Sequence, residues 1–189
     1  MCIRDSGYTV ENGKVTAAPE GAKMTYEIII GADGSGDHPS FAILTDAKAA
    51  LESIGFTLEI NDVTDSNIMW DALNAGTAEM WAAAWQATVD PDMYQVYHSA
   101  SVKSNYYHIN DETLDQDIID ARSTADQEYR KSVYKQCLDI ILDWAVEIPI
   151  YQRQNCVIYS PERINADTFT KDVTTFYSWY GDIINIEMN

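Results

Sequence analysis

Basic residues are scarce in this chain of 189 residues. Twelve lysines and arginines stand against 30 aspartates and glutamates, which gives a formal net charge of −18. The few bases do not gather into a patch anywhere along the sequence. A nucleic-acid duplex or an anionic membrane surface would repel such a chain, so nucleic-acid binding is not expected. The acidity itself favours a protein with a well-solvated surface, and we expect a monomer.

Cysteine is also sparse, and its spacing excludes two classes of small protein. The chain has Cys2, Cys137 and Cys156, an odd number with no C-x-x-C pair. Neither a disulfide framework nor a zinc site is therefore predicted. Cys137 falls on the apolar side of a helical pattern and is predicted to be a core residue. Cys156 lies in a strand-like run, where burial and exposure both remain open.

Long apolar runs are missing. No stretch approaches the 18 apolar residues that a membrane-spanning helix needs. Residues 1–6 contain no hydrophobic region of an export signal and resemble an arbitrary junction. If the protein works outside the cytoplasm, we expect this chain to be missing its own start.

Catalytic, metal and cofactor motifs are absent as well. His38, His98 and His108 lack the close spacing of metal ligands. There is no Gly-x-Ser-x-Gly elbow and no P-loop. The glycine loop of residues 31–36 follows a predicted strand but lacks dinucleotide spacing. The sequence thus predicts neither an enzyme nor a bound cofactor.

The pattern that is present begins with a turn-rich lead-in over residues 7–23, which has room for a short ribbon. A β-rich run at 25–30 follows, then apolar residues at helical spacing from Pro39 to a stop at Gly55. Residues 56–60 alternate between apolar and polar. Strand, helix and strand at these lengths predict a βαβ unit with parallel strands.

The unit is extended once more. Asp65 or Ser66 can cap a helix that ends near Gly76, and residues 79–87 are predicted to form a third strand. Helices are then expected at 93–98, around 114–121, and from Thr124, where Gln127 completes a capping box. A strand is predicted at 150–159, and the aromatic-rich residues 169–186 can hold one or two more.

The fold class predicted from these elements is α/β, with a mainly parallel mixed sheet flanked by helices. Three segments are expected. Residues 1–23 form a polar lead-in, residues 24–168 a lobe, and residues 169–189 a tail.

The most informative segment runs from Trp81 past the carboxyl end of the third predicted strand, where open α/β sheets bind ligands. Trp85 can offer a flat apolar wall, although a tryptophan in a strand can equally be core. Gln86 and Thr88 can offer hydrogen bonds. Asp90 and Asp92 can hold a cation, but Asp-Pro-Asp is a good turn and cap sequence, and we favour that structural role.

Two aromatic clusters are further candidates. Asn105-Tyr106-Tyr107 and residues 176–180 contain rings that can stack on a peptide or a sugar. They can equally be lobe core. We expect one or two of these residues to touch a ligand, and we select Asn105 and Tyr106.

These residues together resemble a family. The strand at 25–30, the block ending in Ile54-Gly55-Phe56, the Trp85-to-Asp92 segment, the run from Asn105 to Asp115 and Pro149-Ile150-Tyr151 are similar to the carboxy-terminal part of family 5 extracellular solute-binding proteins. The resemblance runs from about Gly7 to the end. It implies one lobe of a two-lobed binding protein that closes on a peptide or other small solute outside the cytoplasm. It also implies delivery to the permease subunits of an ABC importer, and no chemistry on the ligand.

One departure from the family concerns specificity. In its peptide-binding members, an aspartate shortly after the tryptophan equivalent to Trp85 grips the amino group of the peptide. Thr88 stands near that place here, and the run to Pro91 is one residue shorter. Either Asp90 substitutes, or the ligand lacks a free amine, so a sugar or another small solute stays open.

Two rival functions remain. One is a carbohydrate hydrolase that uses Asp90 or Asp92 as a catalytic carboxylate. The other is a cytosolic interaction domain that needs no second lobe.

Overall fold

The structure is a computed structural model that describes residues 6–189, apart from residues 33, 87, 102–103, 153 and 172. The chain divides into two compact units. The first contains residues 1–86 and 93–111, and the second contains residues 87–92 and 112–189. The predicted boundaries at residues 23 and 168 stay predictions. Among the described helices, none combines the length and the apolar character that crossing a bilayer requires.

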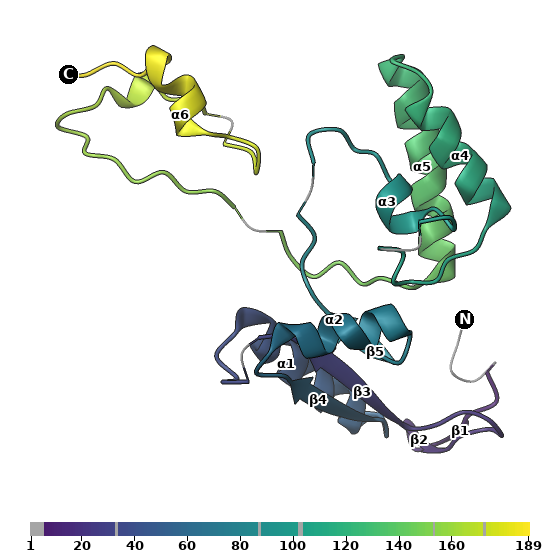
Figure 1. The fold of residues 1–189 in the computed structure, drawn as a ribbon. Coiled ribbons are helices and arrows are strands. Elements are labelled where there is room, and N and C mark those ends of the chain that lie inside the picture. The colour runs from purple at the N-terminus through teal and green to yellow at the C-terminus, as the bar shows by residue number, and fades with distance from the viewer. Residues whose placement is uncertain (1–5, 33, 87, 102–103, 153, 172) are drawn as a thin grey trace. The chain divides into compact units, whose positions relative to one another are not determined.

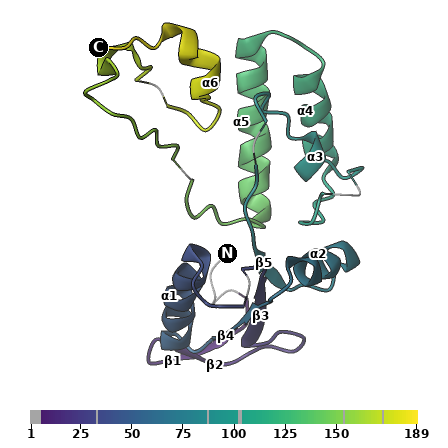
Figure 2. The ribbon, with the colours of Figure 1, turned by 60° about the vertical axis from the view of Figure 1, so that its left-hand side comes forward.

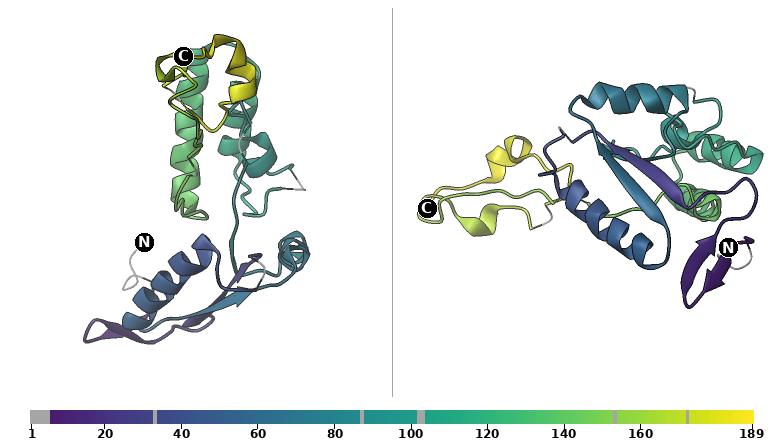
Figure 3. Two further views of the ribbon diagram at one scale, coloured as in Figure 1. Left: turned by 90° about the vertical axis from the view of Figure 1, so that its left-hand side faces the viewer. Right: turned by 90° about the horizontal axis from the view of Figure 1, so that it is seen from below.

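A three-stranded parallel sheet forms the centre of the first unit, in the order β4-β3-β5. Helix α1 covers one face of this sheet and helix α2 the other (Figure 1; Figure 3, right). A separate antiparallel ribbon, β1–β2, precedes the sheet. The strands are β1 (Thr9–Glu11), β2 (Lys14–Ala17), β3 (Thr25–Ile30), β4 (Thr57–Asp62) and β5 (Met80–Ala82), and the helices of this unit are α1 (Pro39–Ser53), α2 (Ser66–Ala75) and α3 (Tyr94–Tyr97).

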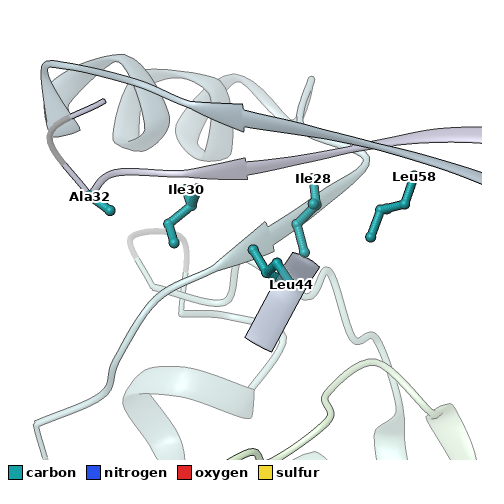
Figure 4. Packing of buried hydrophobic residues seen from close by; sticks show 5 residues of the cluster. All are labelled: Ile28, Ile30, Ala32, Leu44 and Leu58. Carbon is teal, nitrogen blue, oxygen red and sulfur yellow. The ribbon is translucent and has the colours of Figure 1, made fainter. Parts of the chain in front are cut away.

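Alternation along the central strand β3 builds the two cores. Ile28 and Ile30 face α1, where Leu44 meets them together with Leu58 of β4 (Figure 4). Ile29 faces the opposite side and packs into the cluster that α2 covers. A strand buried on both faces is the arrangement that the continuous apolar run of residues 25–30 predicts, so the parallel α/β fold class is confirmed.

Local end signals fix the helices. Pro39 opens α1, and Nδ1 of His38 accepts a hydrogen bond from the backbone N–H of Ser40, which makes this predicted loop residue the N-cap. Asp65 caps α2 through the backbone N–H of Asn67, and Gly76 ends that helix in the left-handed conformation. The predictions for both helices are confirmed.

In the second unit, helices α4 (Glu112–Arg122) and α5 (Gln127–Trp144) pack side by side (Figure 2). The two helices contact each other, and Leu114 and Ile118 of α4 and Val133, Cys137 and Ile141 of α5 are buried. After α5, the described chain contains only short helices: η1 (Ala166–Thr168), α6 (Trp179–Asp182) and η2 (Ile183–Asn185).

The start of α5 corrects one prediction. The carboxylate of Asp126, not the predicted Thr124–Gln127 capping box, accepts from the backbone N–H groups of Glu128 and Tyr129. The hydroxyl of Thr124 instead accepts from the N–H of Asp126. The carboxylate of Asp126 lies two residues nearer the helix than the hydroxyl of Thr124. A carboxylate is also the stronger hydrogen-bond acceptor for the free backbone N–H groups at the start of a helix.

Three strand predictions differ from the structure: the third strand exists but is shorter, and two later segments contain no strand among their described residues. The third strand covers Met80–Ala82 rather than 79–87, because its neighbour β3 ends at Ile30, opposite Ala82, and offers no further backbone partners. The described residues of 150–159 form no strand, and Ile158 there is 94% exposed. Within 169–186 the described residues form short helices, and a single bridge pairs Ile164 with Met188.

The cysteines contrast in environment. Cys137 is fully buried, as predicted, whereas Cys156 is exposed. Cys2 lies outside the described residues. Burial, with a smaller contribution from the charge of Asp117, raises the pKa of the Cys137 thiol from its ordinary 9.0 to about 11. At neutral pH the Cys137 side chain is therefore a neutral thiol without the nucleophilic thiolate.

We expect the two thiols to react at very different rates. In a Cys2→Ser background at pH 8, a thiol reagent such as a disulfide dye should label Cys156 at once and Cys137 only after unfolding. Because the folded pKa is raised, the stabilisation from burying the neutral thiol is complete below pH 9 and declines as the pH rises toward 11. Equal labelling rates in the folded protein would contradict the burial of Cys137.

Candidate functional site

Four aromatic side chains gather on β5 and beyond its carboxyl end in the first unit. We call Trp81, Trp85, Tyr106 and Tyr107 the aromatic platform. Trp85 stacks on Tyr106, with ring centroids 6.3 Å apart and an interplanar angle of 18°. Trp81 stacks on Tyr107 at 5.3 Å and 27°. Nε1 of Trp85 donates a hydrogen bond of 2.9 Å to the hydroxyl of Tyr107, which ties the two stacks together.

The platform rests on the α2 core. Tyr106 and Trp81 are half-buried and pack against the cluster that contains Met69 and Leu73. The ring of Trp70 on α2 lies 5.7 Å from that of Tyr106. The ring of Trp85 contacts Tyr106, and the side chain is 42% exposed to solvent. Of the two interpretations of Trp85 left open by the sequence, the exposed wall fits the structure and the buried core residue does not.

Asn105 makes hydrogen bonds within its own loop, and its predicted contact with a ligand stays a prediction. Its Nδ2 donates to the backbone carbonyl of Ile109 at 2.9 Å and to that of His98 at 3.4 Å, and its Oδ1 accepts from the N–H of Ile109 at 3.3 Å. These bonds close the loop that carries Tyr106 and Tyr107. Asn105 therefore positions the platform through the backbone.

Sequence reasoning missed two rings of this region. Tyr107 was in the aromatic run but was not selected, although its hydroxyl binds the indole of Trp85. Tyr97 on α3 stacks on Tyr107 at 5.7 Å and 7°. The sequence pointed to Tyr97 only indirectly, because Tyr97 lies in the predicted helix that directly follows the candidate segment ending at Asp92. A hollow of about 450 Å³ adjoins Tyr106 and is lined in part by Asn74, Ser101 and His108.

The polar candidates do not all join the platform. Gln86 is exposed in the first unit, directly after Trp85. Thr88 belongs to the second unit, where its hydroxyl donates to the backbone carbonyl of Asp90 at 2.7 Å. The structure brings the rings of Trp81, Trp85 and Tyr106 together, and Gln86 follows Trp85 in the chain. The predicted ligand-binding role of these residues and of Thr88 stays a prediction.

Asp90 and Asp92 bind arginines within the second unit. Oδ1 of Asp90 lies 2.6 Å from Nη2 of Arg130 on α5, and Oδ2 of Asp92 lies 3.1 Å from Nε of Arg122 on α4. The hydrogen bond that Arg130 donates to Asp90, followed by the one that it donates to the hydroxyl oxygen of Tyr134, raises the pKa of the Arg130 guanidinium further above its ordinary range. Both carboxylates therefore make structural ion pairs with arginines, whereas the N-cap of α3 is Met93 and has no side-chain hydrogen bond. The predicted contact of Asp90 with a ligand stays a prediction.

Comparisons with known proteins bear on the fold. No family model and no curated protein matches the sequence. Among solved structures, the oligopeptide-binding protein AppA from Bacillus subtilis, in complex with a nonapeptide, is similar at 18% identity and a TM-score of 0.63, over 76% of this chain and 28% of that chain. The fold of this chain is similar to that of part of this oligopeptide-binding protein.

Two further solute-binding structures support this assignment. The periplasmic binding protein DppA from Helicobacter pylori, in complex with the peptide STSA, matches at 23% identity and a TM-score of 0.55, over 65% of this chain and 24% of that one. NikA from Brucella suis, in complex with Fe(III)-EDTA, matches at 19% identity and a TM-score of 0.59, over 76% of this chain and 29% of that one. The resemblance read from the sequence is thus confirmed at the level of the fold. The chain spans between 24% and 29% of the length of these three solute-binding proteins.

Proposed function

We propose that this chain is the ligand-gripping lobe of a solute-binding protein that captures a peptide or similar small solute for an ABC importer. The observation that carries the proposal is the aromatic platform. Its indole at Trp85 is open to solvent just past the carboxyl end of a parallel strand, in a fold that matches solute-binding proteins. The role is binding and delivery rather than catalysis.

The chemistry of the candidate residues bears on the ligand class. Stacked rings offer apolar faces to aliphatic or cyclic groups, while Gln86 adds a hydrogen-bonding amide. Asp90, the candidate for gripping an amino group, has an oxygen bound to Arg130. An arginine-bound carboxylate is a poor acceptor for a second cation, which supports a ligand without a free amine at that point, such as a blocked peptide or a sugar.

A second lobe forms part of the proposal. Many large apolar side chains after α5 are exposed, and the buried hydrophobic residues among the described ones end at Ile141. Exposed apolar surface on this scale marks an interaction site. We propose that residues 169–189 return toward a hinge and a second lobe, which closes over the ligand. Examples of these side chains, with their exposed fractions, are Ile148 (80%), Ile158 (94%), Tyr180 (71%), Ile184 (89%) and Met188 (70%).

The proposal includes the compartment in which the protein acts and the proteins on which it docks. A binding protein of this kind acts outside the cytoplasm, in a periplasm or anchored at the cell surface, and docks on permease subunits. The full reading frame tests this cheaply. A signal peptide upstream and neighbouring permease and ATPase genes support the proposal, whereas their absence favours the cytosolic interaction domain.

We expect this chain alone to bind weakly, because one lobe leaves half of a ligand in water. Calorimetry with N-acetylated peptides, free peptides and neutral oligosaccharides should give at best micromolar affinity for one class. Trp85→Ala should lower that affinity about fivefold, since stacking on one ring is worth about 1 kcal/mol.

Trp179→Ala provides the matched control, because Trp179 has nearly the same exposure, 41% against 42%. Its replacement should leave the affinity unchanged. Nanomolar affinity of the chain for a peptide, or an equal loss in both variants, would contradict the single-lobe proposal.

A further inference from the structure

The glycine-rich loop after β3 wraps around a carboxylate from the neighbouring strand. Oδ1 of Asp62 accepts from the backbone N–H groups of Ala32 at 3.3 Å and Gly34 at 3.1 Å, and Oδ2 accepts from that of Gly36 at 3.1 Å. Asp62 is the last residue of β4 and pairs with Ile30, the last residue of β3. The side chain therefore reaches the loop from the carboxyl edge of the sheet.

The loop can take this course because of its glycines. Gly34 and Gly36 both have a backbone φ of +73°, which residues other than glycine rarely adopt. A Cβ on Gly34 would lie 2.6 Å from Cγ2 of Thr64, so nothing larger than glycine fits there without movement. The N–H groups of the alternate residues Ala32, Gly34 and Gly36 converge from this loop. Such converging backbone N–H groups form a concave, nest-like site, a structure that binds anions in other proteins.

We infer that this loop is an anion-binding nest that the protein fills with its own Asp62 carboxylate. The consequence is a specificity rule for the carboxyl edge of β3 and β4. The loop's converging N–H groups are occupied, and the Asp62 charge repels a second anion. A phosphate, sulfate or carboxylate group is thus kept out of this corner, while neutral or cationic groups are admitted. The relevance to the ligand rests on the proposed function, whereas the nest itself does not.

Removing the carboxylate should turn the loop into an open anion site. In Asp62→Ala the N–H groups of Ala32, Gly34 and Gly36 lose their acceptor and the negative charge beside them. Inorganic sulfate, titrated at constant ionic strength against chloride, should then shift the amide signals of these residues in ¹⁵N-labelled protein, with saturation in the millimolar range. The wild-type signals should not move over the same titration.

Glu59→Ala serves as the matched control, because it removes an exposed carboxylate from the same strand without touching the loop. It changes the net charge equally, so general attraction of sulfate would appear in both variants. A folded Asp62→Ala protein whose loop amides ignore sulfate overturns the inference. So does a wild-type protein whose loop amides respond as strongly as those of the variant.

Asp62→Asn covers the case in which the alanine variant fails to fold. The amide oxygen keeps an acceptor in the nest but removes the charge, so the amide protons of Gly34 and Gly36 should move upfield and exchange faster with solvent. Unchanged shifts and exchange rates would show that no ionised carboxylate fills the loop. These measurements need no transported ligand, so the nest can fail while the binding function stands, or the reverse.

Discussion

Gly55→Ala is expected to destabilise the first unit by about 3 kcal/mol or more. Gly55 has φ of +99°, and a Cβ there would lie 2.2 Å from the backbone carbonyl oxygen of Val15. That carbonyl belongs to β2, and the N–H of Val15 donates to the carbonyl of Ile54 at 2.7 Å. The ribbon docks on the end of α1 through this close approach, with Val15 buried. Alanine would add backbone strain of about 1–2 kcal/mol and push the ribbon away.

Gly13→Ala separates the two causes. Gly13 has φ of +78°, yet a Cβ there meets nothing within 4 Å, so its substitution should cost only the strain, about 1 kcal/mol. Urea unfolding followed by circular dichroism, with hydrogen exchange at the Val15 amide, compares the variants. Faster exchange at Val15 in Gly55→Ala alone is the expected outcome. Equal losses in both would mean that the close approach contributes nothing.

Elements with local signals were predictable from the sequence. The apolar run at 25–30, the cap at Asp65 and the stops at Gly55 and Gly76 each depend on neighbours within a few residues. Such signals determine helices and turns independently of distant parts of the chain. The order of strands and helices along the first unit could therefore be predicted from the sequence.

Elements that depend on distant partners were not predictable. Residues 150–159 have the composition of a strand, but a strand needs an adjacent backbone, and the described residues there pair with none in a sheet. β5 stops at Ala82 for the same reason, since β3 turns into its glycine loop. Cys156 follows its segment into solvent instead of a core.

The candidate site shows the same division. Trp85 was identifiable from its place after a strand, and the structural role of Asp90 from its turn. Three contacts join residues that lie between 22 and 40 positions apart in the sequence. They are the hydrogen bond from the indole of Trp85 to the hydroxyl of Tyr107, the one from Arg130 to Asp90, and the one from Gly34 to Asp62. No spacing rule links such pairs, because the fold alone brings them together.

Leu114→Ala is expected to cost the second unit about 2–5 kcal/mol, the range for an aliphatic side chain deleted from a sealed core. Leu114, Ile118 and Cys137 are each 0% exposed at the α4–α5 contact, so the cavity cannot fill with water or collapse easily. Trp144, at the end of α5, supplies a fluorescence signal for urea unfolding if the other tryptophans are replaced by phenylalanine. The control is Leu138→Ala on α5, where the side chain is 50% exposed and the loss should stay below about 1 kcal/mol. All buried hydrophobic residues described in this unit lie on these two helices, so the loss should fall on their packing. A Leu114→Ala protein as stable as Leu138→Ala would mean that contacts beyond this helix pair hold the unit together.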